Sequence, residues 1–236
     1  MKDSISILST RPIDGALIEK AAYQNITIDT LTFIEVEKSV TNEVAEQIAL
    51  LSKQKATIVF TSMNAVEIVV DTIPNDAVMP DWKIYCIGGT TFTLVKKYWP
   101  YDSLVYTAKN ATELAQKIIA DKLPAVTFFC GNKRREELPD LLKNENIEVD
   151  ELVVYETIET PVKIEKTYNG ILFFSPSAVT SFFTDNKIPQ ATTLFAIGNT
   201  TANTIKQFCS NNIIISEFPA KDQLVDKAIE YYSKEQ

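Results

Sequence analysis

The sequence predicts an α/β protein with two parallel-sheet domains, each of roughly five strands. Short apolar runs alternate with amphipathic helical stretches along the whole chain, which is typical of parallel sheets covered by helices on both faces. One segment also returns later in the chain, which indicates a duplication. The 236 residues, 45% of them hydrophobic, are enough for two domains.

The repeated segment is residues 25–37, which returns as residues 146–158. The matching pairs are Asn25 and Asn146, Ile26 and Ile147, Asp29 and Asp150, Leu31 and Leu152, and Glu35 and Glu156. Further matches join 60–66 to 173–179, 87–91 to 197–201 and 114–119 to 224–229. The second copy has Tyr155 where the first has Ile34. The repeat leaves open whether neighbouring or crossed halves form each domain.

In the first half of the chain, apolar and β-branched runs predict strands, and apolar residues at helical spacing predict helices. The predicted strands are 4–9, 26–34, 56–60, 83–87 and 102–106, and the predicted helices are 14–24, 42–53, one that ends near 71, 91–98 and 111–120. Residues 35–41 are charged and are predicted to be a crossing segment. Pro74 and Pro80 predict a loop over 73–82.

The second half continues the alternation. The predicted strands are 125–130, 148–157, 170–174, 193–197 and 213–216, and the predicted helices are one that ends near 144, one that opens at 175–179, one that ends near 208 and 221–232. Pro139 suits the first turn of the helix that contains it. Residues 160–169, with Pro161, are predicted to be a linker or loop.

Composition excludes several classes of function. A net charge of -8 disfavours general nucleic-acid binding. The absence of histidine excludes Ser-His-Asp and Cys-His catalysis and histidine metal sites. Cys86, Cys130 and Cys209 stand far apart and are expected to be buried free thiols. We see no long apolar run and no signal peptide, so we expect a cytoplasmic protein with no membrane association.

The predicted carboxyl ends of the strands carry polar residues, where α/β sheets bind their ligands. These segments are Thr10-Arg11, Thr61-Ser62, Gly88–Thr91, Cys130–Arg135, Ser175–Ser177 and Gly198–Thr201. Several of them open helices, whose free N–H groups suit carboxylate or phosphate. The only three arginines, Arg11, Arg134 and Arg135, lie in this set. The pattern indicates an anionic ligand, although no nucleotide-binding glycine motif is present.

A purely structural interpretation of the same residues remains open. Serine and threonine at strand–helix turns are commonly helix N-caps. Residues 133–135 could form a solvated turn, and Tyr155 could be an ordinary strand tyrosine at a domain edge. Glu156 and Glu159 are better explained as exposed strand charges than as a carboxylate pair.

Six motifs occur in order along the chain, and they are Phe-Thr-Ser-x-Asn-Ala-Val (60–66), Ile-Gly-x-x-Thr (87–91), Cys-Gly-Asn-x-x-Arg (130–135), Val-Tyr-Glu-Thr (154–157), Phe-Phe-Ser-Pro-Ser (173–177) and Ile-Gly-x-Thr-Thr (197–201). Through these motifs the chain resembles the uroporphyrinogen-III synthase family. Thr10-Arg11-Pro12 also resembles the start of many bacterial members. One departure is Asn64, where some members carry arginine.

The resemblance implies two flavodoxin-like parallel-sheet domains joined by a two-stranded linker. The first domain would be discontinuous, with residues 1–33 and 160–236, and the second would be residues 38–153. The linker strands would be 31–38 and 153–160, so that they coincide with the repeated segment. Tyr155 would then lie at the mouth between the domains.

The resemblance also implies an activity: ring closure of hydroxymethylbilane, with inversion of the last pyrrole ring and loss of water, in haem biosynthesis. No cofactor or metal is implied. Tyr155 would be the catalytic proton donor. The carboxylates of the substrate would be bound by Arg11, Thr61, Ser62, Thr91, Arg135, Ser175, Ser177, Thr200 and Thr201.

Two other functions remain as alternatives. One is a non-catalytic two-domain protein that binds a tetrapyrrole or another polyanion. The other is a sensor of the response-regulator or periplasmic-binding type, which the polar but non-acidic strand ends and the lack of a signal peptide disfavour. We expect a monomer, and transient contact with the preceding enzyme of the pathway stays open.

Overall fold

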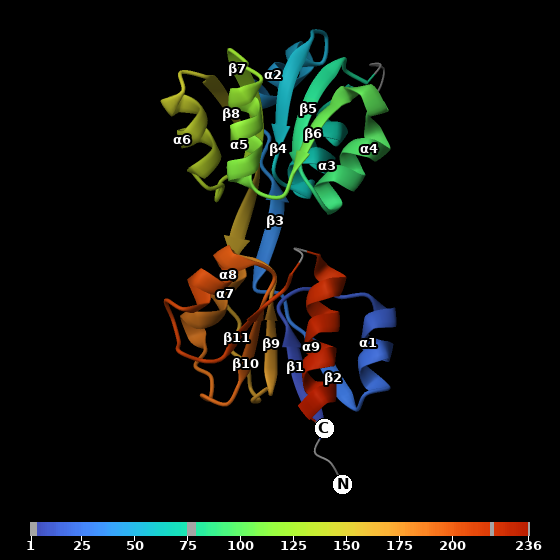
Figure 1. Ribbon diagram of the computed structural model, residues 1–236, viewed down its shortest axis with the longest axis vertical. Coiled ribbons are helices and arrows are strands. Elements are labelled where there is room, and N and C mark those ends of the chain that lie inside the picture. Colours follow the sequence, from blue (N-terminus) through green and yellow to red (C-terminus); the bar gives the residue numbers. More distant parts are fainter. Residues whose placement is uncertain (1–3, 75–78, 218–219, 236) are drawn as a thin grey trace. The chain divides into compact units, whose positions relative to one another are not determined.

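The computed structural model describes residues 4–74, 79–217 and 220–235, which divide into two compact units. Unit 1 consists of residues 1–35 and 158–236, and unit 2 consists of residues 36–157. Each unit contains a sheet of mainly parallel strands with helices packed against both faces (Figure 1). The predicted α/β class is therefore confirmed.

Unit 1 contains a five-stranded sheet in the order β11-β10-β9-β1-β2. Its strands are β1 (Ile5–Ser9), β2 (Ile26–Thr30), β9 (Gly170–Phe173), β10 (Thr193–Ala196) and β11 (Ile213–Ile215). One face packs on α1 (Gly15–Ala22) and α9 (Lys221–Glu235), and the other packs on α7 (Pro176–Asp185) and α8 (Asn199–Ile205). Buried Phe33 lies with the second group and meets the Phe182 ring edge-on at 5.2 Å.

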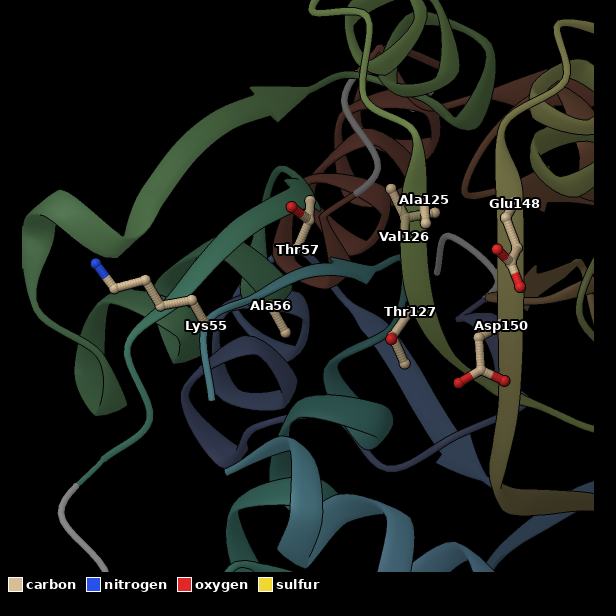
Figure 2. A pocket seen from close by; sticks show the side chains of 8 residues that line it. All are labelled: Lys55, Ala56, Thr57, Ala125, Val126, Thr127, Glu148 and Asp150. Atoms are coloured by element: carbon tan, nitrogen blue, oxygen red, sulfur yellow. The ribbon is translucent and has the colours of Figure 1, made fainter. Parts of the chain in front are cut away.

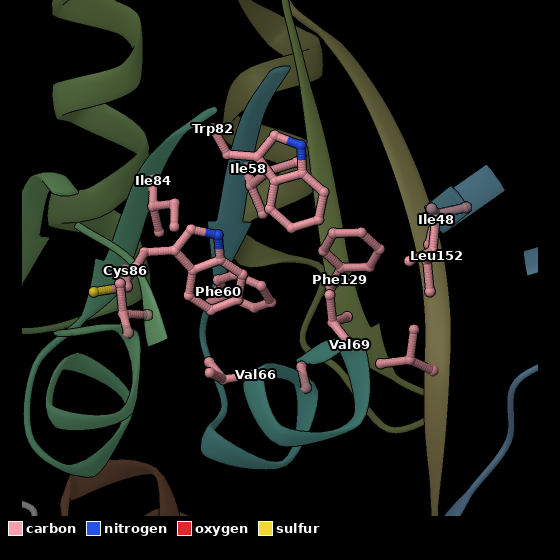
Figure 3. Close-up of a cluster of buried hydrophobic side chains, with 14 of the residues drawn as sticks. Ile48, Ile58, Phe60, Val66, Val69, Trp82, Ile84, Cys86, Phe129 and Leu152 are labelled. Carbon is pink, nitrogen blue, oxygen red and sulfur yellow. The ribbon is translucent and has the colours of Figure 1, made fainter. Parts of the chain in front are cut away.

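Unit 2 contains the strands β4 (Ala56–Phe60), β5 (Trp82–Ile87), β6 (Leu104–Ala108), β7 (Ala125–Gly131) and β8 (Glu148–Glu159). With β3 (Ile34–Lys38), they form the sheet β3-β8-β7-β4-β5-β6. One face packs on α2 (Asn42–Leu51), α3 (Met63–Thr72) and α4 (Thr90–Tyr98), and the other on α5 (Ala111–Ala120) and α6 (Glu137–Asn144). Figure 3 shows the first of these cores, with Phe60 beside Phe129, whose rings stack at 5.6 Å. In the same core Trp82 stacks on Trp99 at 5.8 Å.

The two sheets share one topology. In unit 1 the order β2-β1-β9-β10-β11 is the flavodoxin-like order 2-1-3-4-5. Unit 2 has the same order when β7 and β8 take the places of β1 and β2, so it is a circular permutation of unit 1. The repeated asparagines confirm this correspondence locally, because Asn25 (φ 56°) and Asn146 (φ 59°) both turn in the left-handed region between a helix and the next strand.

Some predicted boundaries were wrong. The predicted strand 26–34 is broken, since Leu31 makes a last backbone bond to Ser9 and Phe33 turns into the core of unit 1. The charged segment 35–41, predicted to be a crossing segment, begins with residues of strand β3, and the chain passes from unit 1 to unit 2 between Glu35 and Val36. Strand β6 begins at Leu104, after a 3₁₀ turn over Tyr101–Ser103, rather than at 102. Helix α8 ends at Ile205, not near 208, because the chain tightens into turns there.

The other predicted elements agree with the structure to within a few residues at each end. Trp82, predicted to close the loop over 73–82, instead begins strand β5 because its side chain is buried in the core. Residues 75–78 of that predicted loop lie outside the described residues.

Candidate functional site

The sequence-predicted site residues lie at the carboxyl ends of parallel strands in both units. In unit 2, Thr61 and Ser62 follow β4, Thr91 follows β5 in the first turn of α4, and Arg135 follows β7. In unit 1, Arg11 follows β1, Ser175 and Ser177 follow β9, and Thr200 and Thr201 follow β10. Because parallel strands end at one edge of a sheet, each unit gathers its own set of these residues.

Tyr155 lies on β8 beside the end of β7, where Gly131 is its partner in the strand register. The tyrosine ring covers the glycine so closely that a Cβ built on Gly131 would lie 2.5 Å from Cζ and 3.0 Å from Cδ2 of Tyr155. The ring also packs against the core that α3 and α4 cover, and the side chain is half-buried. Gly131 is thus what allows Tyr155 to occupy this place.

The environment of Tyr155 keeps its phenol protonated at neutral pH. Burial raises the pKa of Tyr155 above its ordinary value, and a hydrogen bond with the Ser62 side chain opposes that rise without cancelling it. The cause is loss of hydration, which disfavours the phenolate more than the phenol. A protonated phenol beside a polar strand end can donate a proton to a leaving group.

Two of the predicted serines are helix caps. The Ser62 Oγ accepts a hydrogen bond from the Asn64 backbone N–H at 3.2 Å at the start of α3, and the Ser175 Oγ accepts one from the Ala178 N–H at 3.1 Å at the start of α7. This agrees with the capping interpretation of the sequence. For Ser62 the cap and the bond with Tyr155 coexist, so its hydroxyl joins a helix N-terminus to the phenol.

The threonines differ in how far a ligand can reach them. Thr91 is 6% exposed and Thr201 is 3% exposed, whereas Thr61 and Thr200 are half-buried. Gly89 and Gly198 are the N-cap residues that precede helices α4 and α8, and neither glycine supplies a capping side chain. The first-turn N–H groups are therefore the more accessible donors at these two strand ends.

The three arginines have different surroundings. Arg134 pairs with Glu151 on β8 and lies 2.9 Å from Glu136, so its charge is engaged within unit 2. Arg135 is exposed, and it forms no ion pair within the part of the chain that the structure describes. Arg11 is exposed in unit 1, with its guanidinium 5.6 Å from the centre of the Phe174 ring. Arg11 and Arg135 are thus the arginines open to an anionic ligand.

A surface hollow of about 330 Å³ lies at the opposite edge of the unit 2 sheet, around the amino ends of β4, β7 and β8 (Figure 2). Its lining residues are Lys55, Ala56, Thr57, Ala125, Val126, Thr127, Glu148 and Asp150. None of the residues predicted to bind a ligand lines it. Its two carboxylates also make it a poor receptor for an anion.

Other reactive groups are buried or dispersed. Burial raises the pKa of the Cys86 thiol to about 11 and that of the Cys130 thiol to about 12, so both are neutral, as the sequence predicted for buried thiols. Cys209 is only partly buried. Among the described residues, no three histidine, cysteine or acidic side chains gather closely enough to hold a metal ion. Over that same part of the chain, no helix is long and apolar enough to cross a membrane.

Sequence reasoning missed Gly131 and Asn132, although both stand in the Cys-Gly-Asn motif. The Asn132 backbone N–H donates to the Tyr155 carbonyl at 3.1 Å, and its side-chain Oδ1 accepts from the Thr157 N–H at 2.9 Å. The motif was a usable signal, but it gave no indication that these residues contact the tyrosine segment.

The fold and the site define a class: an α/β protein of two flavodoxin-like units whose strand ends are suited to an anionic ligand. The sequence matches the family described as Uroporphyrinogen-III synthase HemD over residues 16–226. The chain therefore belongs to the uroporphyrinogen-III synthase family, a family of cyclising, lyase-type enzymes in tetrapyrrole and haem biosynthesis.

Solved structures share the fold. The uroporphyrinogen-III synthetase of Helicobacter pylori 26695 is 17% identical, with a TM-score of 0.65 over 96% of this chain and 99% of that chain. A mutant uroporphyrinogen III synthase from the extremely thermophilic bacterium Thermus thermophilus is 14% identical, with a TM-score of 0.64 over 98% of this chain and 100% of that chain. At these identities the comparison supports the architecture, and the family match supports the function.

Proposed function

We propose that this protein closes hydroxymethylbilane to uroporphyrinogen III, inverting the last pyrrole ring and releasing water. The family match supports the reaction. The observation that carries the assignment of residues is Tyr155, a half-buried phenol with a raised pKa that lies on Gly131 beside the hydroxyl of Ser62.

In the proposed mechanism, Tyr155 donates its proton to the departing hydroxyl group of the bilane, so that the carbon–oxygen bond breaks and water leaves. The phenolate regains a proton when the closing ring loses one, which balances the cycle. A group that moves a proton in this way typically contributes about a hundredfold or more to the rate.

The remaining predicted residues bind the acid side chains of the substrate. Arg11 and Arg135 are the exposed arginines, and the hydroxyls and helix N-termini at the other strand ends add uncharged donors. These residues are Thr61, Ser62, Thr91, Ser175, Ser177, Thr200 and Thr201. Their role is to hold the linear tetrapyrrole in the shape that inverts its last ring, since orientation can account for much of such a rate.

We further propose that residues 1–33 with 160–236 and residues 38–153 act as two domains joined by linker strands 31–38 and 153–160. The grouping of contacts into residues 1–35 with 158–236 and residues 36–157 supports these limits. The family resemblance is the basis for proposing a cytoplasmic monomer that needs no cofactor. Sedimentation of the purified protein, with and without the preceding enzyme of the pathway, tests the monomer and the transient contact.

The deciding experiment is the isomer of the product from freshly generated hydroxymethylbilane, with and without this protein. Predominantly type III product supports the proposal. Type I product at the uncatalysed rate would refute it and favour the alternative, a non-catalytic tetrapyrrole- or polyanion-binding protein.

A further inference from the structure

The turn that follows β7 contacts strand β8 at three residues. Arg134 pairs with Glu151, Asn132 donates its backbone N–H to the Tyr155 carbonyl, and the Asn132 side chain accepts the Thr157 N–H. The turn itself is closed by the Arg134 N–H, which bonds to the Gly131 carbonyl at 3.1 Å. We propose that Gly131 and Asn132 are positioning residues that fix the Tyr155 phenol for proton transfer, an inference that rests on the proposed function.

Gly131 positions Tyr155 because its lack of a side chain leaves room for the tyrosine ring. The Tyr155 ring occupies the volume that any larger residue at position 131 would need. The glycine has no left-handed φ angle, so its requirement is steric and not conformational. The atoms that a Cβ would meet belong to the outer part of the ring, which can swing aside. A methyl group at position 131 therefore displaces the phenol while the strands can remain paired.

Asn132 acts through hydrogen bonds at a break in the ladder. The register between β7 and β8 shifts between Cys130 and Gly131, so regular pairing is disturbed next to the tyrosine. Asn132 lies just beyond this shift, and its backbone and side chain together bond on both sides of Glu156, at Tyr155 and Thr157. Although its side chain is exposed, it replaces ladder contacts and limits rotation of the Tyr155 backbone.

The first test compares Gly131→Ala with Gly15→Ala, a control at a glycine that has nothing within 4 Å of a built Cβ. We expect Gly131→Ala to lower kcat about tenfold with KM changed by less than about twofold, because misplacement of a reacting group by about 1 Å can cost up to about a hundredfold. Gly15→Ala keeps the wild-type kcat. An unchanged kcat for a folded Gly131→Ala variant would overturn the role of Gly131.

A double-mutant cycle with Tyr155→Phe separates positioning from general damage. If Gly131→Ala acts by moving the phenol, it lowers kcat in the wild type but adds little once the hydroxyl is gone. Asn132→Ala, with an expected loss of about threefold from one missing hydrogen bond, follows the same pattern. Losses that multiply fully in the double variants would overturn the positioning role.

The outcomes also separate this inference from the proposed function. Wild-type protein that forms no type III isomer would refute the proposed function, and the inference with it. Type III product from the wild type, together with multiplicative losses in the cycle, overturns the positioning role alone. Melting temperatures of all variants, within a few degrees of wild type, show that the rates report folded protein.

Discussion

The two copies of the repeated segment begin alike and end differently. Each begins at an asparagine with a positive φ angle, Asn25 or Asn146, and then enters a strand. The first copy breaks after Thr30, buries Phe33 and resumes as β3 in the other sheet, whereas the second runs unbroken over Glu148–Glu159. The same segment thus forms the crossing between units in one copy and carries a candidate proton donor in the other.

The neighbouring strands show the same divergence. At the end of β1, buried Thr10 bonds with its hydroxyl to the Leu172 carbonyl at 2.8 Å, which closes that part of the unit 1 edge. At the end of β7, the topological equivalent of β1, Gly131 leaves room for an aromatic ring. The two units thus share one topology, and the residue at the end of the equivalent strand decides whether a threonine hydroxyl or an aromatic ring occupies that position.

The largest effect should come from the buried ring of the first copy. Phe33→Ala removes a fully buried side chain packed against Phe182 and should lower the free energy of unfolding by about 3–5 kcal/mol. The kcat of the folded fraction should not change. Urea unfolding combined with the isomer assay measures both quantities. A loss below about 1 kcal/mol, or a specific fall in kcat, would contradict the structural role given to this copy.

A substitution in the second copy of the repeated segment should change activity rather than stability. Tyr155→Phe should lower kcat about ten- to a hundredfold, equivalent to about 1.4–2.7 kcal/mol, because the proton donor is lost while the ring still packs on Gly131. Tyr106→Phe is a matched control, since that phenol donates to Glu113 at 2.9 Å, away from the site. Steady-state rates with trapped type III product provide the test. An unchanged rate removes Tyr155 as the acid.

The ion pairs of Glu151 on β8 and Asp29 on β2 should differ in how much stability they add, and both contributions should depend on pH. Burial alone would raise the pKa of Glu151, but its pairs with Lys143 and Arg134 outweigh burial and hold it below its ordinary 4.5. The pair with Lys166 is the main cause that lowers the pKa of Asp29 on β2, where the side chain is 43% exposed. The stability that each carboxylate adds is therefore present above its unfolded pKa and lost as pH falls through its folded pKa.

We accordingly expect Glu151→Gln to lower the free energy of unfolding at pH 7 by about 1–2 kcal/mol, and Asp29→Asn by less than about 1 kcal/mol. The Glu151 difference should shrink as the solution is acidified below pH 4.5, and the Asp29 difference as it is acidified below pH 3.8, the ordinary pKa of each carboxylate. Thermal melts between neutral and acidic pH measure them. Equal losses of stability in the two variants, or losses that grow on acidification, would contradict the stabilising roles assigned to these ion pairs.

The smallest expected effect is a difference in kcat between variants of two helix caps, Ser62 and Thr41. Ser62→Ala and Thr41→Ala each remove a cap at the start of a unit 2 helix and should each cost about 1 kcal/mol of stability. Only Ser62 contacts the phenol, where its hydrogen bond lowers the pKa of Tyr155. Ser62→Ala raises that pKa further, weakens the acid and should reduce kcat by less than about tenfold. Equal kcat values in the two variants would show that Ser62 is only a cap.

The sequence predicted individual strands and helices because hydrophobic periodicity and composition are local properties. Runs such as Ala56–Phe60 and Ala111–Ala120 carry their own pattern, and both elements were predicted to the residue. The break at residues 31–33 could not be predicted, because the burial of Phe33 depends on a helix far along the chain. Likewise, the charged segment 35–41 was predicted only as a crossing segment, and its pairing as β3 could not be predicted because its neighbour β8 lies more than a hundred residues later.

The site was partly predictable for a related reason. Strand ends in a parallel sheet gather at one edge, so the strand–helix alternation was enough to place Thr61, Ser62 and Ser175 there. The contact of Gly131 with Tyr155 joins two strands, and nothing local in either strand encodes it. The motif placed Arg135 in the site, but nothing local in the sequence indicated that Arg134 pairs with Glu151.

The permuted strand order has a consequence for synthesis on the ribosome. All of unit 2 lies within residues 36–157, so it can fold as soon as that stretch has emerged. In contrast, β1 must wait for its neighbour β9, which begins at Gly170. The first 35 residues can pair β1 with β2 early, but their sheet is completed last, and unit 2 lies in the chain between the two halves of unit 1.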